Sequence, residues 1–137
     1  MAVTHLLDTS IYSQRLRPQP HAVAIARWDA LGDAVVVTSA VCEAEVLFGI
    51  ARKKSQRLAQ NFATRLRPRV SILPLDSAVA AAYAELRADS ESVGVTTAPM
   101  DLLIAATAKA HGLIVATLNI KHFDNIVGIV AEDWSQP

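Results

Sequence analysis

The sequence predicts an α/β fold in which a mainly parallel sheet lies between two layers of helices. Short aliphatic and β-branched runs alternate along the chain with longer segments whose apolar residues recur at helical spacing. Strands separated by helices need crossover connections, which make the strands parallel and cover both faces of the sheet. A hydrophobic fraction of 52% with only 5% aromatic residues fits a core of Ala, Val, Leu and Ile. We therefore expect a three-layer α/β/α sandwich, formed by residues 1–137 as one domain.

The first half of the chain is predicted to hold three strands and three helices. In order, these are a strand at 3–7, a helix at 20–31 stopped by Gly32, a strand at 34–39, a helix at 39–54 with Ser39 as N-cap, a helix at 55–68 ended by Pro68, and a strand at 70–76. Three consecutive valines at 35–37 favour a strand covered on both faces.

The second half follows the same alternation. It is predicted to contain a helix at 76–92 capped by Asp76 or Ser77, a loop at 94–99, a helix from Pro99 to the stop at Gly112, a strand at 113–117, a connection at 118–125, and a final short strand and tail at 126–134.

The totals exclude some classes of protein. The 13 basic and 13 acidic residues balance, so the net charge argues neither for nor against a nucleic-acid partner. The one cysteine, Cys42, cannot form an intramolecular disulfide, which fits a reducing compartment. The chain start lacks the pattern of a signal peptide, and no apolar run approaches the ~20 residues that cross a membrane. We expect a soluble, cytoplasmic protein with no membrane association.

Acidic and polar residues recur where predicted strands end or the following helices begin. Asp8 follows the first strand, Glu43 and Glu45 lie in the helix after the second, Asp101 lies in the first turn of the helix from Pro99, and Thr117 and Asn119 end and follow the strand at 113–117. The carboxyl ends of parallel strands share one edge of a sheet, so these groups are expected to converge on Asp8. Clustered carboxylates repel one another unless a divalent cation neutralises them, and oxygen ligands favour Mg²⁺ or Mn²⁺ over zinc.

Each acid also has a simpler interpretation. Asp8 could cap the helix that starts near Ser10, and Asp101 could be stabilised by the helix dipole, by about 0.3–1 kcal/mol. Glu43 and Glu45 could lie on a solvated helix face. They are about 200° apart around the helix axis, so only one of them can face a common site.

Three segments, "LLDTS", "SAVCEAEVLFG" and "APMDLLIAATAKAHGLIVATLNIKHF", resemble the PIN-domain ribonucleases, and most of all the VapC-type toxins of type II toxin–antitoxin pairs. The resemblance covers essentially the whole chain, down to the closing "EDW". It implies metal-binding acids at Asp8, Glu45 and Asp101, with Glu45 chosen by the pattern E-x-x-x-G that ends at Gly49. Gly49 shares a helix face with Glu45, and we expect it to leave room for a close approach.

The fourth position of the family's acidic site falls on Asn119, where many members have an acid. The lower charge favours one Mg²⁺ over two. Ser10 and Thr117 are expected to orient a carboxylate or a bound water. Water activated by the metal would attack the phosphodiester of single-stranded or looped RNA, and either Asp8 or Asp101 could accept its proton.

The resemblance also implies partners. We expect phosphate contacts from Arg15, Lys121 and His122, although His122 could equally be an ordinary exposed loop residue. Further cations lie at Arg17 and in 51–57, and Tyr12, Phe123 and Trp134 could either stack on bases or pack in the core. The family forms homodimers and larger complexes with a VapB-type antitoxin whose tail fills a groove beside the active site. The apolar residues expected to suit such a groove are Val46, Leu47, Phe48 and Ile50.

Two other functions remain open at this point. The same acids could serve a metal nuclease that acts on DNA, or a small phosphatase-like enzyme. Alternatively, because Asn119 replaces an acid, the chain could be a catalytically weak or inactive PIN module that acts by binding an antitoxin or another partner.

Overall fold

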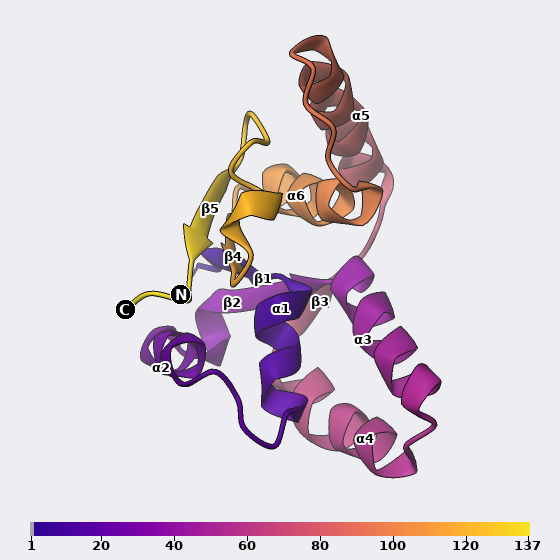
Figure 1. Cartoon of the computed structure of the whole chain (residues 1–137), viewed down its shortest axis with the longest axis vertical. Coiled ribbons are helices and arrows are strands. Elements are labelled where there is room, and N and C mark those ends of the chain that lie inside the picture. The colour runs from indigo at the N-terminus through magenta and orange to yellow at the C-terminus, as the bar shows by residue number, and fades with distance from the viewer. Residues whose placement is uncertain (1) are drawn as a thin grey trace.

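The computed structural model describes residues 2–137, which form a five-stranded sheet with helices on both faces (Figure 1). The strands are β1 (His5–Leu7), β2 (Val36–Ser39), β3 (Ser71–Leu73), β4 (Ile114–Thr117) and β5 (Val130–Asp133). Their order across the sheet is β3-β2-β1-β4-β5, and every neighbouring pair is parallel. The predicted α/β class is confirmed, with a sheet that is parallel throughout.

Six α-helices are found in the described part of the chain. They are α1 (Thr9–Tyr12), α2 (Ala22–Leu31), α3 (Ala40–Lys53), α4 (Gln56–Asn61), α5 (Ser77–Ser92) and α6 (Pro99–His111). Shorter helical turns extend or connect them: η1 (Ser13–Leu16), η2 (Asp33–Val35), the π-helical η3 (Phe62–Leu66), η4 (Arg67–Arg69) and η5 (Ile120–His122).

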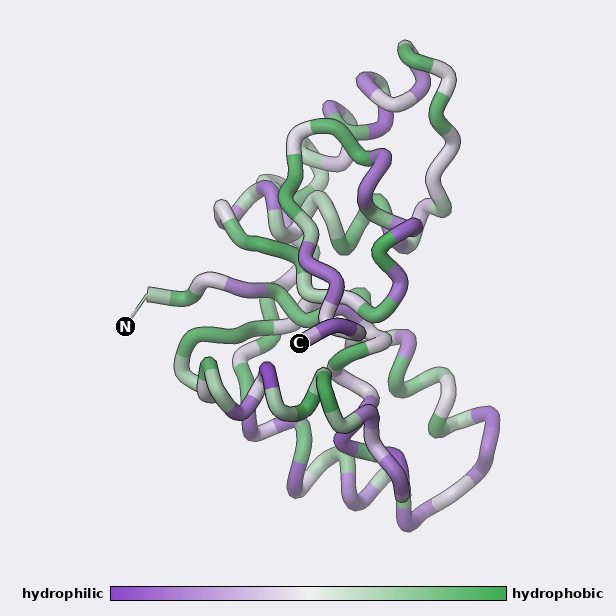
Figure 2. Tube along the Cα trace, turned by 60° about the vertical axis from the view of Figure 1, so that its left-hand side comes forward, coloured by the Kyte–Doolittle hydropathy of each residue, from purple (hydrophilic) through white to green (hydrophobic). Residues whose placement is uncertain are grey.

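Successive strand residues point to opposite faces of the sheet, and each face has its own core. Leu6, Val37 and Val115 pack in a cluster with α5 and α6. Their neighbours Leu7, Val36 and Ala116 pack in a second cluster with α1, α2, α4 and part of α3. In Figure 1, α5 and α6 lie above the sheet and α1, α2 and α4 below it, and Figure 2 shows hydrophobic and hydrophilic positions alternating along these helices. These clusters are the two interfaces of the predicted three-layer sandwich.

Local signals in the sequence set the helix ends as expected. The Ser39 hydroxyl accepts the backbone N–H of Cys42 at 3.1 Å and begins α3. The Asp76 side chain, rather than Ser77, caps α5 by accepting the N–H of Val79 at 3.0 Å. Pro99 begins α6, and Gly112 ends it at φ +65°, a conformation that glycine adopts without strain.

The strands are shorter than predicted. The edge strand β3 covers three residues, because Pro74 follows it and has no N–H to continue the ladder. Only Val130–Asp133 of the predicted segment 126–134 is a strand, since a turn with Gly128 at φ +95° precedes it. The predicted helix at 55–68 is divided into α4, η3 and η4, and Pro68 lies inside the last of these turns.

A set of side chains that we call the C-terminal clasp (His5, Arg27, Glu132 and Trp134) fixes β5. Glu132 Oε1 lies 2.9 Å from His5 Nε2 and accepts Trp134 Nε1–H at 3.1 Å. Arg27 Nη1 donates to the Asp133 carbonyl at 3.0 Å. Burial acts to raise the pKa of Glu132, but the hydrogen bonds from Trp134 and His5 and the charge of Arg27 outweigh it and lower that pKa.

Within residues 2–137, none of the helices combines the length and the apolar character needed to cross a bilayer.

Candidate active site

Asp8 stands at the carboxyl end of β1, with only 5% of its surface exposed. Its Oδ1 accepts Ser10 Oγ–H at 2.6 Å and the N–H of Ile11 at 3.2 Å, and its Oδ2 accepts Thr117 Oγ1–H at 2.6 Å. Asp8 is therefore the N-cap of α1, as its simpler interpretation predicted. Burial raises its pKa, these hydrogen bonds oppose the rise, and repulsion from Asp101 adds to it.

Asp101 lies in the first turn of α6, and 22% of its side chain is exposed. His122 Nδ1 lies 3.3 Å from Asp101 Oδ2. Burial raises the pKa of Asp101, His122 acts against the rise, and the charge of Glu45 adds to it. Asp101 thus interacts electrostatically with both Asp8 and Glu45.

The two glutamates of α3 have different neighbours. Glu45 Oε1 accepts a hydrogen bond from Thr9 Oγ1. Glu43 instead forms an ion pair with Arg67, 2.8 Å from its Nε. Of the two, Glu45 is the one directed toward the segment that follows β1.

Two hydroxyls connect Asp8 to the loop after β4. Ser10 Oγ accepts the N–H of Leu118 at 2.9 Å, and Thr117 Oγ1 accepts the N–H of Asn119 at 2.9 Å. Because each hydroxyl also donates to Asp8, its orientation is fixed on both sides. Ser10 and Thr117 therefore hold the carboxylate in one position.

Among the described residues, no side-chain hydrogen bond or ion pair joins Asn119 or Lys121 to the three acids. Asn119 is exposed, and its recorded hydrogen bonds are made by its backbone. Lys121 is also exposed. Gly49 lines the same hollow as Glu45, and a Cβ placed there would meet no atom of the described residues within 4 Å, so the space expected beside Glu45 is open.

Arg15 differs from a free phosphate-binding residue. Its guanidinium lies 4.2 Å from the centre of the Trp28 ring and pairs with Asp29. Only 16% of its side chain is exposed. Arg15 is therefore a fixed, partly neutralised cation.

The stacking interpretation of three aromatic residues is wrong. Tyr12, Phe123 and Trp134 are at most 1% exposed and pack in the two cores. Their rings are not accessible to bases. Burial also raises the pKa of Tyr12, to about 12.

The four apolar residues expected to share a groove are divided between two environments. Val46 and Ile50 are buried and line a hollow, whereas Leu47 and Phe48 are exposed and do not line it. On a helix, positions 46 and 50 share one face and 47 and 48 point elsewhere.

That hollow, which we call the cationic groove, has a volume of about 1420 Å³. Its walls are η1 with the segment 17–20, one side of α3, and α4 with η3. Thr9 and Glu45, which form a hydrogen bond with each other, belong to its lining. The groove therefore begins at the candidate site.

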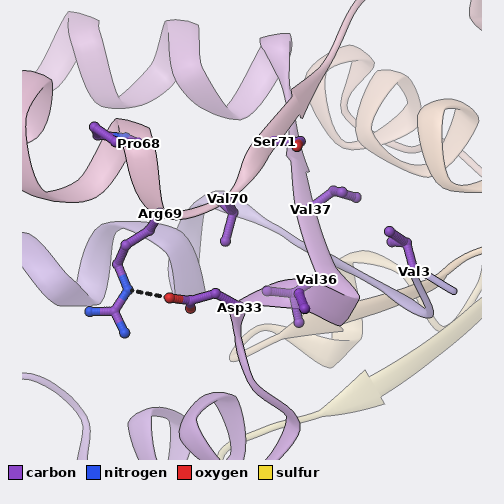
Figure 3. A pocket seen from close by; sticks show the side chains of 9 residues that line it. Val3, Asp33, Val36, Val37, Pro68, Arg69, Val70 and Ser71 are labelled. Carbon is purple, nitrogen blue, oxygen red and sulfur yellow. Dashed lines mark hydrogen bonds and ion pairs between the residues drawn. The ribbon is translucent and has the colours of Figure 1, made fainter. Parts of the chain in front are cut away.

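A smaller hollow of about 430 Å³ lies at the amino ends of β2 and β3 (Figure 3). Valines and the ion pair between Arg69 and Asp33, 3.1 Å long, line it. Asp8 lies at the carboxyl end of β1, so this hollow is at the opposite edge of the sheet.

The carboxylates of Asp8, Glu45 and Asp101 do not form a tight cluster. Within residues 2–137, no three His, Cys, Asp or Glu side chains are close enough together to hold one metal ion directly. Asp101 raises the pKa of Asp8, and Glu45 raises that of Asp101, so a divalent cation that relieves this repulsion fits these carboxylates chemically. Mg²⁺ usually keeps several waters and needs only one or two carboxylates.

Two contacts of this site were not foreseen from the sequence. Thr9 donates a hydrogen bond to Glu45. His122 was considered for RNA, but its nearest recorded partner is Asp101. The only signal for either contact is that Thr9 follows Asp8 directly and that His122 lies five residues after Thr117.

Comparison with known families decides the assignment of this fold. A family model described as "PIN domain" matches residues 5–128. The chain belongs to the PIN-domain family. The resemblance inferred from the sequence is thereby confirmed.

Curated relatives of this PIN domain include a toxin and a VapC endonuclease. It is 40% identical to Toxin FitB of Neisseria gonorrhoeae (strain ATCC 700825 / FA 1090) over 126 residues, covering 86% of this chain and 89% of FitB. It is 31% identical to the tRNA(fMet)-specific endonuclease VapC of Shigella flexneri, covering 95% and 97% of the two chains. This PIN domain is homologous to the VapC and FitB toxins.

Solved structures of similar proteins lead to the same family assignment. The crystal structure of FitAcB from Neisseria gonorrhoeae superposes with a TM-score of 0.89 at 35% identity, covering 98% of this chain and 100% of that one. VapBC2 from Rickettsia felis, bound to a DNA fragment from its promoter, gives 0.83 at 25% identity, covering 98% and 99%. The structural neighbours are thus toxin–antitoxin complexes.

Proposed function

We propose that this PIN domain is a Mg²⁺-dependent endoribonuclease and the toxin of a VapBC-type toxin–antitoxin pair. The observation that carries the proposal is the position of Asp8 at the carboxyl end of β1, next to Thr9, which donates a hydrogen bond to Glu45, in a chain homologous to VapC ribonucleases. An RNA substrate puts its site of action in the cytoplasm. The proposal treats residues 1–137 as one functional PIN domain.

Asp8, Asp101 and Glu45 are the residues that would hold Mg²⁺. When bound, the ion would supply an acidified water and polarise the phosphoryl oxygen of the RNA. We assign Mg²⁺ rather than zinc because carboxylate oxygens are the only side-chain ligands proposed. Mn²⁺ satisfies the same ligand chemistry.

The structure favours different roles for the two aspartates. Both oxygens of buried Asp8 already accept hydrogen bonds, so Asp8 serves as a fixed negative charge. Asp101 is more exposed, and His122 is its one recorded polar contact. Because Asp101 is more exposed than Asp8 and its oxygens accept fewer hydrogen bonds, we assign it the proton of the attacking water.

The proposed partners are a VapB-type antitoxin and a second copy of this chain. Antitoxin binding is supported by FitAcB and VapBC2, both toxin–antitoxin complexes. Leu47 and Phe48, 46% and 64% exposed on α3, are an apolar pair that a protein partner would cover. Loss of the dimer or of antitoxin binding in Phe48→Asp, measured by light scattering, tests this assignment.

A catalytically inactive module is the second candidate. It is favoured by the exposed position of Asn119 and by the loose spacing of the acids within the described residues. Calorimetric titration with Mg²⁺ separates the two: saturable binding that Asp8→Asn abolishes supports the nuclease, and no binding at millimolar Mg²⁺ supports the inactive module.

Matched RNA and DNA oligonucleotides test the activity. The purified protein is incubated with each strand in Mg²⁺ and in EDTA. We expect cleavage of RNA in Mg²⁺ alone. Cleavage of DNA at the same rate would support the general metal nuclease instead, and cleavage of RNA in EDTA would contradict the metal dependence.

A further inference from the structure

We propose that the cationic groove binds the phosphate backbone of one RNA strand as it leaves the site of cleavage. This inference rests on the proposed nuclease function and adds to it a second, non-catalytic contact with the substrate. Its experiment is chosen so that the two proposals can fail separately.

Two helical stripes form the groove. On α3, positions 45, 49, 52 and 53 all line it, which is one face of a helix. On α4 and η3, positions 57, 61 and 65 follow the same spacing. The two helices run one after the other through the turn at Lys54, so the stripes form neighbouring walls of one channel.

The groove has a strong charge bias in a chain of zero net charge. Seven of the 13 Lys and Arg residues line it, but only one of the 13 Asp and Glu residues, Glu45. Five of these cations have no carboxylate within ion-pair distance among residues 2–137: Arg17, Arg52, Lys53, Arg57 and Arg65. Such unpaired cations attract a polyanion and are its counterions when it binds.

The other two cations are held in place. Arg15 and Arg69 lie 4.2 and 5.6 Å from the ring centre of buried Trp28. Asp29 pairs with Arg15, and Asp33 pairs with Arg69 and accepts the indole N–H of Trp28 at 2.8 Å. These two guanidinium groups are positioned before any ligand arrives.

The groove runs away from the candidate site over a length that suits a short stretch of an RNA strand. Glu45 lies at one end of the α3 stripe and Lys53 eight residues on, a distance of about 12 Å along the helix. That length accommodates about three nucleotides at the ~3.4 Å spacing of a stacked strand. A strand cut beside Asp8, Asp101 and Glu45 must continue past them, and this channel opens directly from Glu45.

The residues that line the groove also determine which part of an RNA strand it contacts. No aromatic side chain of the described residues lines the groove, so bases have no ring to stack on. The contacts are therefore to phosphates, and binding here is independent of base sequence. Sequence preference must come from elsewhere on the protein.

The test neutralises two exposed groove cations, in Arg57→Gln/Arg65→Gln. The control, Lys54→Gln/Arg87→Gln, changes the net charge equally, and neither of its residues lines the groove. Affinity for a labelled single-stranded RNA is measured in EDTA over a range of salt concentrations. We expect at least a fivefold loss for the groove variant, and a salt slope shallower by about 1.4, at about 0.7 per phosphate contact. Equal affinities of groove variant and control would overturn the proposal.

A second pair of measurements separates this inference from the nuclease assignment. With Mg²⁺, the groove variant is expected to cleave with a raised KM and an unchanged kcat. Groove-dependent binding by a protein that never cleaves RNA would refute the nuclease and support the groove. Cleavage with an unchanged KM would refute the groove and support the nuclease. Arg52→Gln/Lys53→Gln repeats the test on the other wall, with thermal unfolding as the check on folding.

A protein partner is the competing occupant. Affinity of both double variants for a purified VapB-type antitoxin is measured beside their affinity for RNA. If the groove variant loses antitoxin binding and keeps RNA binding, the groove belongs to the protein partner and the proposal is overturned.

Discussion

The hydroxyl of Thr117 donates a hydrogen bond of 2.6 Å to Oδ2 of Asp8, which lies 109 residues earlier in the chain. The sheet produces this contact. Leu7 of β1 pairs in register with Ala116 of β4, so the next residue of each strand emerges beside the other. A parallel sheet therefore places Asp8 and Thr117 together before any metal or substrate binds.

Thr117→Val tests the role of this contact. Valine keeps the buried shape but leaves Oδ2 of Asp8 without its donor, so we expect stability to fall by about 1.5–3 kcal/mol. RNA cleavage should fall by about 10–100-fold, the usual effect of losing a side chain that orients a metal ligand. Urea denaturation and initial cleavage rates measure both. Thr117→Ser keeps the hydroxyl and should stay near wild type; equal losses in both variants would assign Thr117 to packing alone.

The two glutamates of α3 form a matched pair for a second prediction. Glu45→Gln removes a carboxylate that faces the candidate site, and we expect cleavage to fall by at least about tenfold. Glu43→Gln breaks only a surface ion pair with Arg67, worth at most about 1 kcal/mol. Its cleavage rate should match the wild type. A larger loss in Glu43→Gln than in Glu45→Gln would reverse the assignment within the helix.

Much of the fold was predictable because local signals agreed with the global arrangement. Ser39, Pro99 and Gly112 each begin or end a helix by their own backbone chemistry, and alternating strands and helices imply a parallel sheet. The strand lengths were not predictable in this way. The extent of β3 depends on how much of β2 lies opposite it, which is a property of the assembled sheet.

For the candidate site too, some features were predictable from the sequence and others were not. Asp8 and Asp101 were predicted as site residues because they stand at the ends of elements, and Asp101 raises the pKa of Asp8 in the folded chain. Thr9 was missed because its bond to Glu45 depends on how α1 packs against α3. Tyr12 and Trp134 were ambiguous because an aromatic residue in the sequence does not show whether its ring is covered.

Gly49→Ala tests whether the glycine in α3 has a structural role. A methyl group there would meet nothing within 4 Å, and alanine is a better helix former by about 0.5–1 kcal/mol. We expect the variant to be more stable by about that amount in urea denaturation. A loss of stability would show that the glycine is needed for the fold itself. A stable variant with a raised KM for RNA would show that a ligand in the cationic groove needs the space.

The C-terminal clasp predicts a pH dependence of stability. The pKa of Glu132 is lowered in the folded state from its ordinary 4.5, so its stabilising effect is complete above that value and is lost as the pH falls through the folded-state pKa. Glu132→Gln should therefore cost about 1 kcal/mol at pH 7 and much less in strong acid. Denaturation curves at several pH values measure the difference. A cost that stays constant at all pH values would mean that the carboxylate charge is irrelevant to the clasp.

The most direct test of the proposed nuclease is the cleavage of one labelled RNA in Mg²⁺ by the wild type and by Asp101→Asn. The account predicts a fall in kcat of at least about 100-fold, the scale of losing one electrostatic group at a reaction centre. It also predicts that Asp101→Asn unfolds no more easily at neutral pH. The pKa of Asp101 is raised in the folded state, so the protonated carboxyl favours folding and this contribution is lost as the pH rises through that pKa. Asparagine does not titrate, so the variant does not lose stability in this way. Cleavage by a folded Asp101→Asn at the wild-type rate would contradict the assignment of this carboxylate cluster as the active site.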